Sequence, residues 1–397
     1  MSSDPWRKVR IGEIANIVMG QSPESKYYNN SGNGLPFLQG NRAFGFKYPT
    51  YDTFCTNGNK FAKPNDVLLS VRAPVGDLNI AKDNICIGRG LASLSMINGN
   101  NEYLYYLLKA NINKLISQES GTVYGSINRN DIYNFEVLVH DSDEKQRDFS
   151  DIFSTLDDKI DLNRQTNKTL EEIAQAIFKE WFIDFNYPGA TGEMVDSPLG
   201  PIPQGWRVGE LSELCNITMG QSPPGDSYNE DGKGVPFFQG RSDFNFRFPS
   251  KRMYTIDPKR YAAKLDTLVS VRAPVGDMNV ALENCCIGRG LAAVIEKEGN
   301  SSFTYYFLNN LTTQLKTFED NGTVFGSITK KDFESIQCVI PPRKIINLFE
   351  SQLHPVDESI LNNCMEEESL KVIRDNLLTK FMKYDSGVKH DQEIYRD

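Results

Sequence analysis

The chain of 397 residues carries nearly the same sequence twice, and the second copy is displaced by 200 residues. A duplication of this length predicts two similar lobes related by an approximate two-fold axis. Such a body suits a target that is itself roughly two-fold, and duplex DNA is the commonest such target. The strongest matches are residues 19–23 (MGQSP) with 219–223, 36–40 (PFLQG) with 236–240 (PFFQG), 70–77 (SVRAPVGD) with 270–277, 87–92 (IGRGLA) with 287–292, and 121–127 (GTVYGSI) with 322–328 (GTVFGSI).

Each copy divides into a lobe and a helical tail. In the lobes, short apolar runs at 66–71 and 267–271 predict strands, frequent Gly and Pro predict many loops, and 103–116 and 303–315 predict short amphipathic helices. We therefore expect mixed α/β lobes with irregular sheets. The expected boundaries are 1–141 for the first lobe, 142–187 for a central helical region, 188–342 for a linker and the second lobe, and 343–397 for a distal helical region and C-terminal tail.

The tails predict long helices. Residues 156–185 contain no Gly or Pro, and apolar residues recur there in steps of three and four; the second tail repeats the same phase, with Asn163 and Asn363 in the same position of the two seams. This pattern favours two helices that pack lengthwise as an antiparallel coiled coil, over helices that each pack only on their own lobe. Residues 186–189 and 386–387 are expected to end the helices, and Pro355 to split or kink the second.

The paired helices would act as a spacer between the lobes. Thirty helical residues span ~45 Å, more than one turn of B-DNA at ~34–36 Å. The fold class expected from the sequence is therefore α+β, with two similar lobes separated by two long antiparallel helices and a pseudo-two-fold internal repeat.

Composition and motifs argue against several functional classes. No apolar run approaches the ~20 residues of a membrane span, and the first ten residues carry no signal-peptide core, so we expect a soluble, cytoplasmic protein. Seven cysteines without a C-x-x-C pair predict buried free thiols. There is no phosphate loop, dinucleotide fingerprint or H-E-x-x-H motif, and the histidines, His140, His354 and His390, fall in no evident constellation. We expect a binding protein without cofactor or metal rather than an enzyme.

Charge is distributed unevenly along the chain. The net charge is −9, yet residues 1–140 carry +3, 141–199 carry −8, 200–342 carry −1 and 343–397 carry −3. DNA affinity comes largely from Lys and Arg that release counterions from phosphates. The lobes supply little of this, so a basic partner is expected to provide most of the non-specific affinity, and the acidic helical regions are where that partner is expected to bind.

The candidate DNA-contacting residues are polar or aromatic side chains in the repeated motifs. They are Gln21, Ser22, Gln39, Asn41, Arg42, Arg72, Arg89, Tyr124 and Ser126 in the first copy, and Gln221, Ser222, Gln239, Arg241, Arg272, Arg289, Phe325 and Ser327 in the second. Gln and Asn can pair bidentately with adenine, and Arg with guanine. The alternative for the motifs at 39–42 and 239–242 is a polar turn whose side chains cap nearby backbone.

Three further groups of residues have either a binding role or a structural role, and the sequence does not distinguish the two. For Arg72 and Arg272 the alternatives are contact with phosphate or only a pair with Asp77 and Asp277 across the turn. For Arg89, which is flanked by glycines, the alternatives are close approach to a ligand or a place in a structural glycine turn. Aromatic residues alternate as in a strand and are more typical of core than of a stacking platform; they are Phe44, Phe46 and Tyr48, with Phe244, Phe246 and Phe248 in the second copy.

With these motifs the chain resembles the specificity subunits of type I restriction–modification systems. The four motifs at 19–23, 36–40, 70–77 and 87–92 each occur twice, and residues 170–182 (LEEIAQAIFKEWF) and 373–378 (IRDNLL) resemble that family's central and distal spacer helices. The resemblance implies two target-recognition domains that read a split DNA site. It also implies helices that dock methyltransferase subunits, of which two are expected, and a nuclease/translocase subunit in the larger complex.

The sequence therefore predicts a non-catalytic, sequence-specific DNA-binding subunit. Similar lobes predict related half-sites in inverted orientation, and Asn41 against Arg241 predicts adenine in one half and guanine in the other. The rival interpretations are a two-fold protein scaffold that never contacts DNA, and a methyltransferase or nuclease with an unrecognised site.

Overall fold

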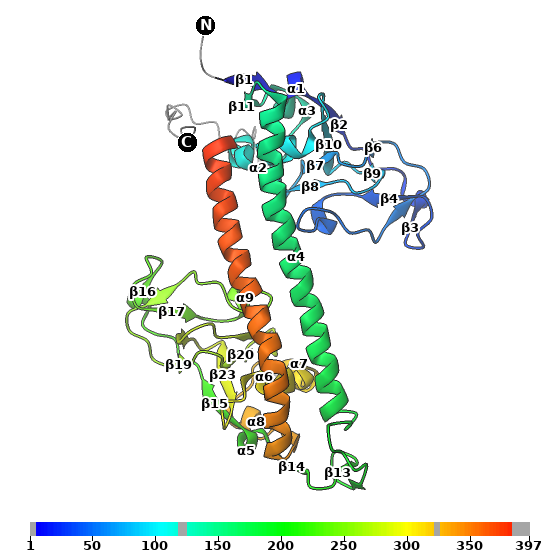
Figure 1. Ribbon diagram of the computed structural model, residues 1–397. Coiled ribbons are helices and arrows are strands. Elements are labelled where there is room, and N and C mark those ends of the chain that lie inside the picture. Colours follow the sequence, from blue (N-terminus) through cyan, green and yellow to red (C-terminus); the bar gives the residue numbers. More distant parts are fainter. Residues whose placement is uncertain (1–4, 118–124, 321–325, 383–397) are drawn as a thin grey trace. The chain divides into compact units, whose positions relative to one another are not determined.

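The computed structural model of the protein describes residues 5–117, 125–320 and 326–382. It separates into two compact units, one of Met1–Gln165 with Asn363–Asp397 and one of Thr166–Asn362. The boundary falls inside the two longest helices, α4 (Asp143–Phe182) and α9 (Arg343–Met382). Each unit therefore holds one lobe together with one part of each long helix (Figure 1). Within the described residues, none of the helices combines the length and the apolar character that a membrane span requires.

The lobe of the first unit is a set of small sheets with short helices. Its elements are β1 (Trp6–Arg10), α1 (Ile11–Ile14), β2 (Ala15–Met19), β3 (Tyr28–Asn29), β4 (Leu35–Leu38), β5 (Phe54–Cys55), β6 (Phe61–Ala62), β7 (Val67–Ser70), β8 (Leu78–Ile80), β9 (Ile85–Ile87), β10 (Leu91–Met96), α2 (Asn101–Ser117), α3 (Arg129–Asn134) and β11 (Glu136–His140). β1 pairs with β11, an antiparallel sheet has the order β2-β10-β7-β8, and a mixed sheet has the order β3-β5-β4-β9-β6. In the mixed sheet β4 and β9 are parallel, so their carboxyl ends meet at one edge.

The second unit repeats this lobe, with an additional strand pair, β12 and β13, before it and two helices, α6 and α7, where the first lobe has α2. Its elements are β12 (Met194–Val195), β13 (Ile202–Pro203), β14 (Arg207–Glu210), α5 (Leu211–Leu214), β15 (Cys215–Met219), β16 (Tyr228–Asn229), β17 (Val235–Phe238), β18 (Tyr254–Thr255), β19 (Tyr261–Ala262), β20 (Thr267–Ser270), β21 (Met278–Val280), β22 (Cys285–Ile287), β23 (Leu291–Glu296), α6 (Ser301–Asn310), α7 (Thr312–Asp320), α8 (Lys330–Glu334) and β24 (Gln337–Ile340). The sheets β14-β24, β15-β23-β20-β21 and β16-β18-β17-β22-β19 match those of the first lobe, and β17 is again parallel to β22. The duplicated α+β fold expected from the sequence is confirmed.

In the first unit the two long helices contact each other in antiparallel orientation. Asn163 of α4 donates to the Glu366 carboxylate of α9 at 2.8 Å, and Arg164 lies 2.6 Å from Glu367. Further along, Asp157 pairs with Arg374 at 2.6 Å, so the residue number rises in α9 as it falls in α4. Asn163 is almost fully buried, in agreement with a polar residue inside the seam.

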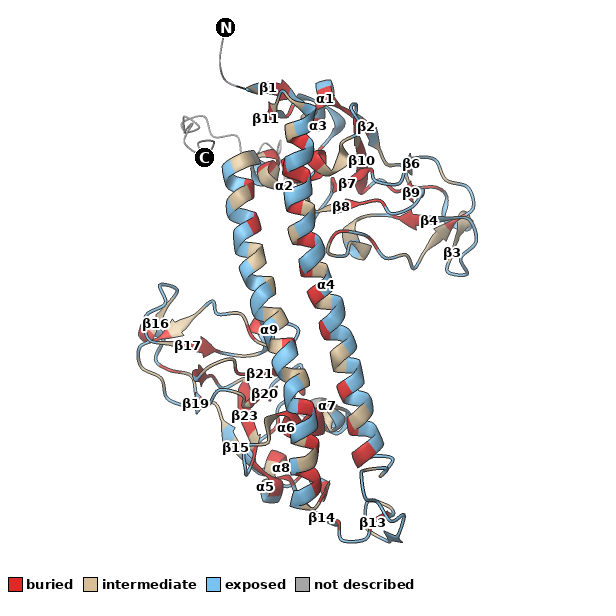
Figure 2. Ribbon diagram, viewed as in Figure 1, coloured by how far each residue is buried: buried red, intermediate tan, exposed pale blue. Residues whose placement is uncertain are grey.

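In the second unit the same antiparallel contact is mainly aromatic. The Phe349 ring of α9 lies 5.8 Å from Phe178 and 5.1 Å from Phe182 of α4, and Phe182 also packs on Phe303 of the lobe at 5.2 Å. Each unit thus has a hydrophobic cluster to which both the lobe and the long helices contribute. Figure 2 shows buried residues recurring along both helices between exposed turns, as expected for helices with one apolar face.

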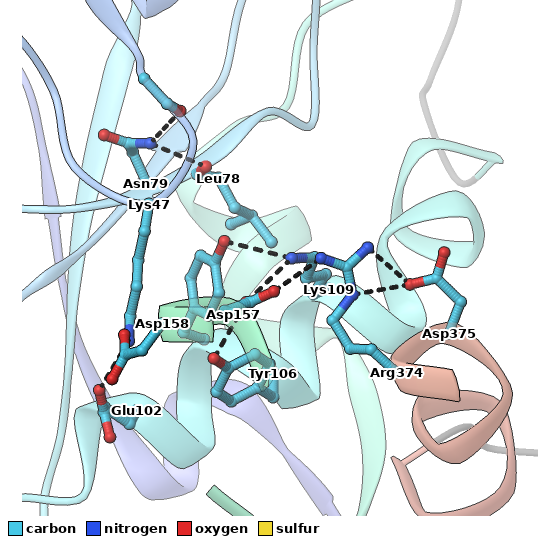
Figure 3. A network of polar contacts seen from close by, with 12 residues as sticks. Lys47, Leu78, Asn79, Glu102, Tyr106, Lys109, Asp157, Asp158, Arg374 and Asp375 are labelled. Atoms are coloured by element: carbon cyan, nitrogen blue, oxygen red, sulfur yellow. Dashed lines mark hydrogen bonds and ion pairs between the residues drawn. The ribbon is translucent and has the colours of Figure 1, made fainter. Parts of the chain in front are cut away.

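A buried carboxylate ties lobe and helices together in the first unit (Figure 3). Asp157 of α4, only 1% exposed, accepts from Tyr106 of α2 at 3.0 Å and pairs with Lys109 at 3.5 Å and Arg374 at 2.6 Å. Burial lowers the pKa of Lys109, whereas the hydrogen bond and the charge of Asp157 more than offset the burial of Arg374 and raise its pKa. The opposite charges are in contact, which offsets part of the cost of removing them from water.

The structure corrects several expected elements. α4 runs from Asp143 to Phe182, so it starts before the Gly- and Pro-free run at 156–185 and within the helical region expected from 142. Its first turns bury Phe149 and Phe153 on the lobe, and Phe149 also stacks on Phe381 of α9 at 5.4 Å. α9 continues through Pro355, an exposed residue, because the neighbouring turns bury Leu353 and Ile360 and this packing outweighs the missing hydrogen bond.

Two lobe elements also differ from expectation. The helix expected over 303–315 is broken at Leu311 into α6 and α7, after the poor helix formers Asn309 and Asn310. The aromatic alternation at 44–48 is not a strand. A 3-10 helix (Asn41–Ala43) precedes it, Phe44 forms an isolated bridge to Pro49, and residues 45–48 lie in a loop.

Candidate nucleic-acid interface

Polar side chains gather where the parallel strands β4 and β9 end. Leu38 lies opposite Ile87 in this pair, so Gln39, one residue after Leu38, and Arg89, two residues after Ile87, lie at the same edge of the sheet. The chain after β2 joins them, because the backbone N–H of Gln21 donates to the Ile87 carbonyl at 3.0 Å. We call Gln21, Ser22, Gln39 and Arg89 the glutamine cluster. All are exposed except Ser22, which is partly buried.

Ser22 is the centre of the glutamine cluster. Its hydroxyl donates to Gln39 Oε1 at 2.9 Å and accepts from the backbone N–H of Arg89 at 3.2 Å. The second lobe repeats both bonds: Ser222 donates to Gln239 at 3.0 Å and accepts from Arg289 at 3.3 Å. With Gln221, these residues form the glutamine cluster of the second lobe.

The glycines on either side of Arg89 let the two strand ends approach closely. A Cβ on Gly88 would lie 2.6 Å from Gln39 Oε1, and a Cβ on Gly90 would lie 2.5 Å from the Gln39 carbonyl oxygen. Gly288 and Gly290 are placed alike against Gln239. The glycines therefore have a structural reason, while the Arg89 and Arg289 side chains remain exposed beside the glutamines.

The residues at 41 and 241 contact the turn that follows Arg72 or Arg272. Asn41 donates to the Asp77 carboxylate and to the Pro74 carbonyl, the latter at 3.4 Å, and Arg241 pairs with Asp277. Asn41 and Arg241 are each the first residue of a 3-10 helix, Asn41–Ala43 and Arg241–Asp243. The contact of residues 41 and 241 with Asp77 and Asp277 was not predicted from the sequence, although the aspartate recurs in both copies of the motif at 70–77.

The arginines before that turn do not pair with its aspartate. Among the described residues no ion pair joins Arg72 to Asp77 or Arg272 to Asp277, so the purely local interpretation of these arginines is wrong. Both arginine side chains are exposed, and their backbones form isolated bridges with Ser126 and Ser327.

The remaining predicted residues fall into two groups. Arg42 is exposed and pairs with Asp52 at 2.6 Å, and this pair is not repeated in the second lobe, where Ser242 occupies the position. Tyr124 and Phe325 lie outside the described residues.

A basic and an aromatic residue beside each glutamine cluster were not predicted. The Lys60 carbonyl accepts from the Ile87 N–H at 2.9 Å, which places Lys60 at the same strand end, and Phe61 next to it is 44% exposed. In the second lobe the Arg260 carbonyl accepts from the Ile287 N–H at 3.0 Å, and Tyr261 is 52% exposed. Exposed basic and aromatic residues suit contact with phosphates and bases. The sequence feature that could have identified these residues is that a basic and an aromatic residue recur in both copies at a spacing of 200 residues.

Residues 5–117, 125–320 and 326–382 contain no group of three or more His, Cys, Asp or Glu side chains arranged to hold a metal ion. The glutamine clusters instead combine amide, hydroxyl, guanidinium and backbone N–H groups, which are the kinds of group that hydrogen-bond bases and phosphates in protein–DNA complexes.

The model of a family described as the type I restriction modification DNA specificity domain matches residues 3–172 and 203–367. The chain is similar to the type I restriction enzyme MjaX specificity subunit of Methanocaldococcus jannaschii, at 32% identity over 284 residues, which are 70% of this chain and 66% of that protein. The MjaIX specificity subunit of the same organism is 26% identical, and the match covers 95% of this chain and 92% of the relative. Among solved structures, the S subunit of a type I restriction–modification system from M. genitalium aligns over 96% of each chain with a TM-score of 0.66 and 16% identity, which supports the fold.

Proposed function

The chain belongs to the family of type I restriction–modification specificity subunits, and from this premise we propose that it binds a bipartite DNA site without catalysing a reaction. The observation that carries the proposal is the repeated glutamine cluster. The same hydroxyl, amide and arginine groups are exposed at the same strand ends in both lobes. In this proposal each cluster faces one half of the site, and the exposed basic residues beside it contact phosphates.

The two half-sites are proposed to be related in inverted orientation but not identical. Asn41 and Arg241 occupy equivalent positions and share an aspartate partner, so they present an amide in one lobe and a guanidinium in the other. The Arg241–Asp277 pair is 50% and 36% exposed. Exposed pairs of this kind contribute less than about 1 kcal/mol, so Arg241 can exchange Asp277 for a guanine at little cost.

The long helices are proposed to set the gap between the half-sites and to dock two methyltransferase subunits, to which a nuclease/translocase subunit is added in the larger complex. In support of this, the two helices contact each other in antiparallel orientation inside each unit. In the first unit the outer faces of the helices carry exposed apolar residues, Leu162 of α4 and Val372 of α9 among them, at 57% and 60% exposure. Such residues favour a protein partner over water.

Methylation mapping tests the proposal directly. The full chain is expressed with the methyltransferase subunit of its own host in a strain that lacks other DNA methyltransferases, and methylated positions are mapped across the genome. We expect a single split motif with two specified halves and an unspecified gap of constant length. Methylation that requires the chain but follows no such motif would contradict the proposal and favour a scaffold that does not read DNA.

A separate assay tests the non-catalytic role. The purified chain alone is incubated with DNA and either S-adenosylmethionine or magnesium. Neither methyl transfer nor cleavage is expected, and turnover by the chain alone would assign catalysis to it.

A further inference from the structure

The glutamine cluster holds Gln39 in one orientation. The Ser22 hydroxyl accepts the Arg89 N–H and donates its single proton to Gln39 Oε1. The Gln39 backbone is held as well, because its carbonyl accepts from the Gly90 N–H at 3.1 Å. The side chain therefore has less rotational freedom than an ordinary exposed glutamine, and that pre-organisation lowers the entropic cost of binding.

The amide oxygen faces the protein. Ser22 occupies one side of Oε1, and the Cα of Gly88 lies so close to its other side that a Cβ there would be 2.6 Å away. The amide nitrogen is different, because no described residue accepts a hydrogen bond from Gln39 Nε2, and the residue is exposed. The second lobe has the same arrangement around Gln239, where a Cβ on Gly288 would lie 2.7 Å from Oε1.

This orientation decides which bases the glutamine can read. A glutamine that recognises adenine must accept from the base N6 with its oxygen while its nitrogen donates to N7. With the oxygen committed to Ser22, only donors are presented. Guanine offers two acceptors, N7 and O6, on its major-groove edge, whereas thymine offers only one, O4, beside its methyl group. Cytosine offers a donor that this amide would face unpaired.

We propose that Gln39 and Gln239 each read a guanine through their amide N–H groups alone, and that Ser22 and Ser222 act as positioning residues which exclude adenine. The proposal rests on the proposed function, because it requires the lobes to bind DNA. It replaces the glutamine–adenine pairing expected from the sequence. Because both clusters are the same, the two half-sites should share this guanine in inverted orientation.

Selection from a randomised duplex library tests the proposal. The probe is the full chain assembled with the methyltransferase subunit of its host, as wild type, Gln39→Glu, Gln239→Glu, Ser22→Ala and Ser222→Ala. Glutamate has the shape of glutamine but cannot donate, so Gln39→Glu should lose the guanine preference in the first half-site by about fivefold or more. The second half-site should be unchanged, which serves as an internal control for folding and assembly. Gln239→Glu should show the mirror result.

The serine variants test the orientation of the amide. Ser22→Ala releases Oε1, so the same position should accept adenine as well as guanine. A second measurement needs no protein variant: 7-deazaguanine at that position removes N7 and should lower the affinity of the wild-type complex about fivefold or more.

The outcomes separate the two hypotheses. If the wild-type complex selects no motif, the proposed function fails and the guanine assignment fails with it. If a split motif is selected but Gln39→Glu leaves it unchanged, or the two halves share no guanine, only the guanine assignment is overturned. If Gln39→Glu alters the motif but Ser22→Ala still selects guanine alone, the positioning role of Ser22 is overturned.

Discussion

At the scale of single residues, the second lobe shows that an arginine fits the position of Asn41. Arg241 occupies it there and pairs with Asp277, the equivalent of Asp77. Asn41→Arg should therefore fold normally, find Asp77 as its partner, and change one base pair of the first half-site toward guanine, which methylation mapping would detect. Arg241→Asn is the matched control and should alter only the second half. An unchanged first half-site would remove residue 41 from DNA recognition.

The cysteines allow a test of burial by chemical labelling. Burial raises the pKa of the Cys86 thiol to about 11 and that of Cys285 to about 12. Both thiols therefore stay protonated and unreactive at pH 8, where a thiolate-directed reagent should label the half-buried Cys364 first. Mass spectrometry of the labelled native protein checks the order, and labelling of Cys86 ahead of Cys364 would contradict it.

The same shifts predict how stability depends on pH. A thiol with a raised pKa in the folded state favours folding below its unfolded pKa, near 8.5, and loses this contribution as pH rises toward the folded value. The urea midpoint should accordingly fall between pH 9 and 11, and less steeply in Cys86→Ala.

At the scale of elements, replacing the proline inside one long helix should stabilise the protein. Pro355 lies within α9, its side chain is exposed, and Ser359 donates to its carbonyl at 2.9 Å. Because proline removes a backbone donor and crowds the preceding turn, Pro355→Ala should raise the free energy of unfolding by about 1 kcal/mol or more. Thermal unfolding measures this. A lower melting temperature would show that proline at this position contributes to the packing of the helix.

The two lobes are tied to their helices by equivalent cations in different surroundings. Arg247 is buried between Glu171 of α4 and Asp357 of α9, at 12% and 20% exposure, and its guanidinium lies 3.9 Å from the Tyr305 ring. Arg247→Ala leaves these carboxylates without a counter-charge and should destabilise the second unit by about 3–5 kcal/mol.

Lys47 is the matched control for Arg247. Its partners Glu102 and Asp158 are 40% and 67% exposed, so they are hydrated when the lysine is removed. Lys47→Ala should therefore cost about 1 kcal/mol. Hydrogen exchange under urea, followed on α6 for the second unit and α2 for the first, separates the two effects. Equal losses in both units would contradict the burial argument.

At the scale of the whole molecule, charge predicts that the chain depends on a partner to bind DNA strongly. The net charge is −9 and the lobes are close to neutral, so few counterions are released when the chain alone meets a duplex. At about 0.15 M salt the chain should bind non-specific duplex at least about tenfold more weakly than its complex with the methyltransferase, and with a shallower dependence on salt. A salt titration of both species measures this, and equal slopes would place the basic surface on the chain itself.

Much of the architecture was predictable because it depends on local pattern. The duplication predicted matching lobes, and the steps of three and four between apolar residues predicted two helices in antiparallel contact, with Asn163 inside the seam. The ends of the helices were less predictable, since the first turns of α4 bury Phe149 and Phe153 on the lobe, and a seam pattern does not report such contacts.

The sequence by itself determined that the molecule is built twice, that its polar motifs recur in both copies, and that long apolar-faced helices follow each lobe, because repeats and periodicity are properties of neighbouring residues. Only the tertiary structure decided what those motifs bind to within the protein. Hydrogen bonds join Gln39 to Ser22, Asn41 to Asp77, and Asp157 to Arg374, and the residues of these pairs are 17, 36 and 217 positions apart in the sequence. Such pairs form through strand register and helix packing, and these are set by the burial of the whole core rather than by any local pattern.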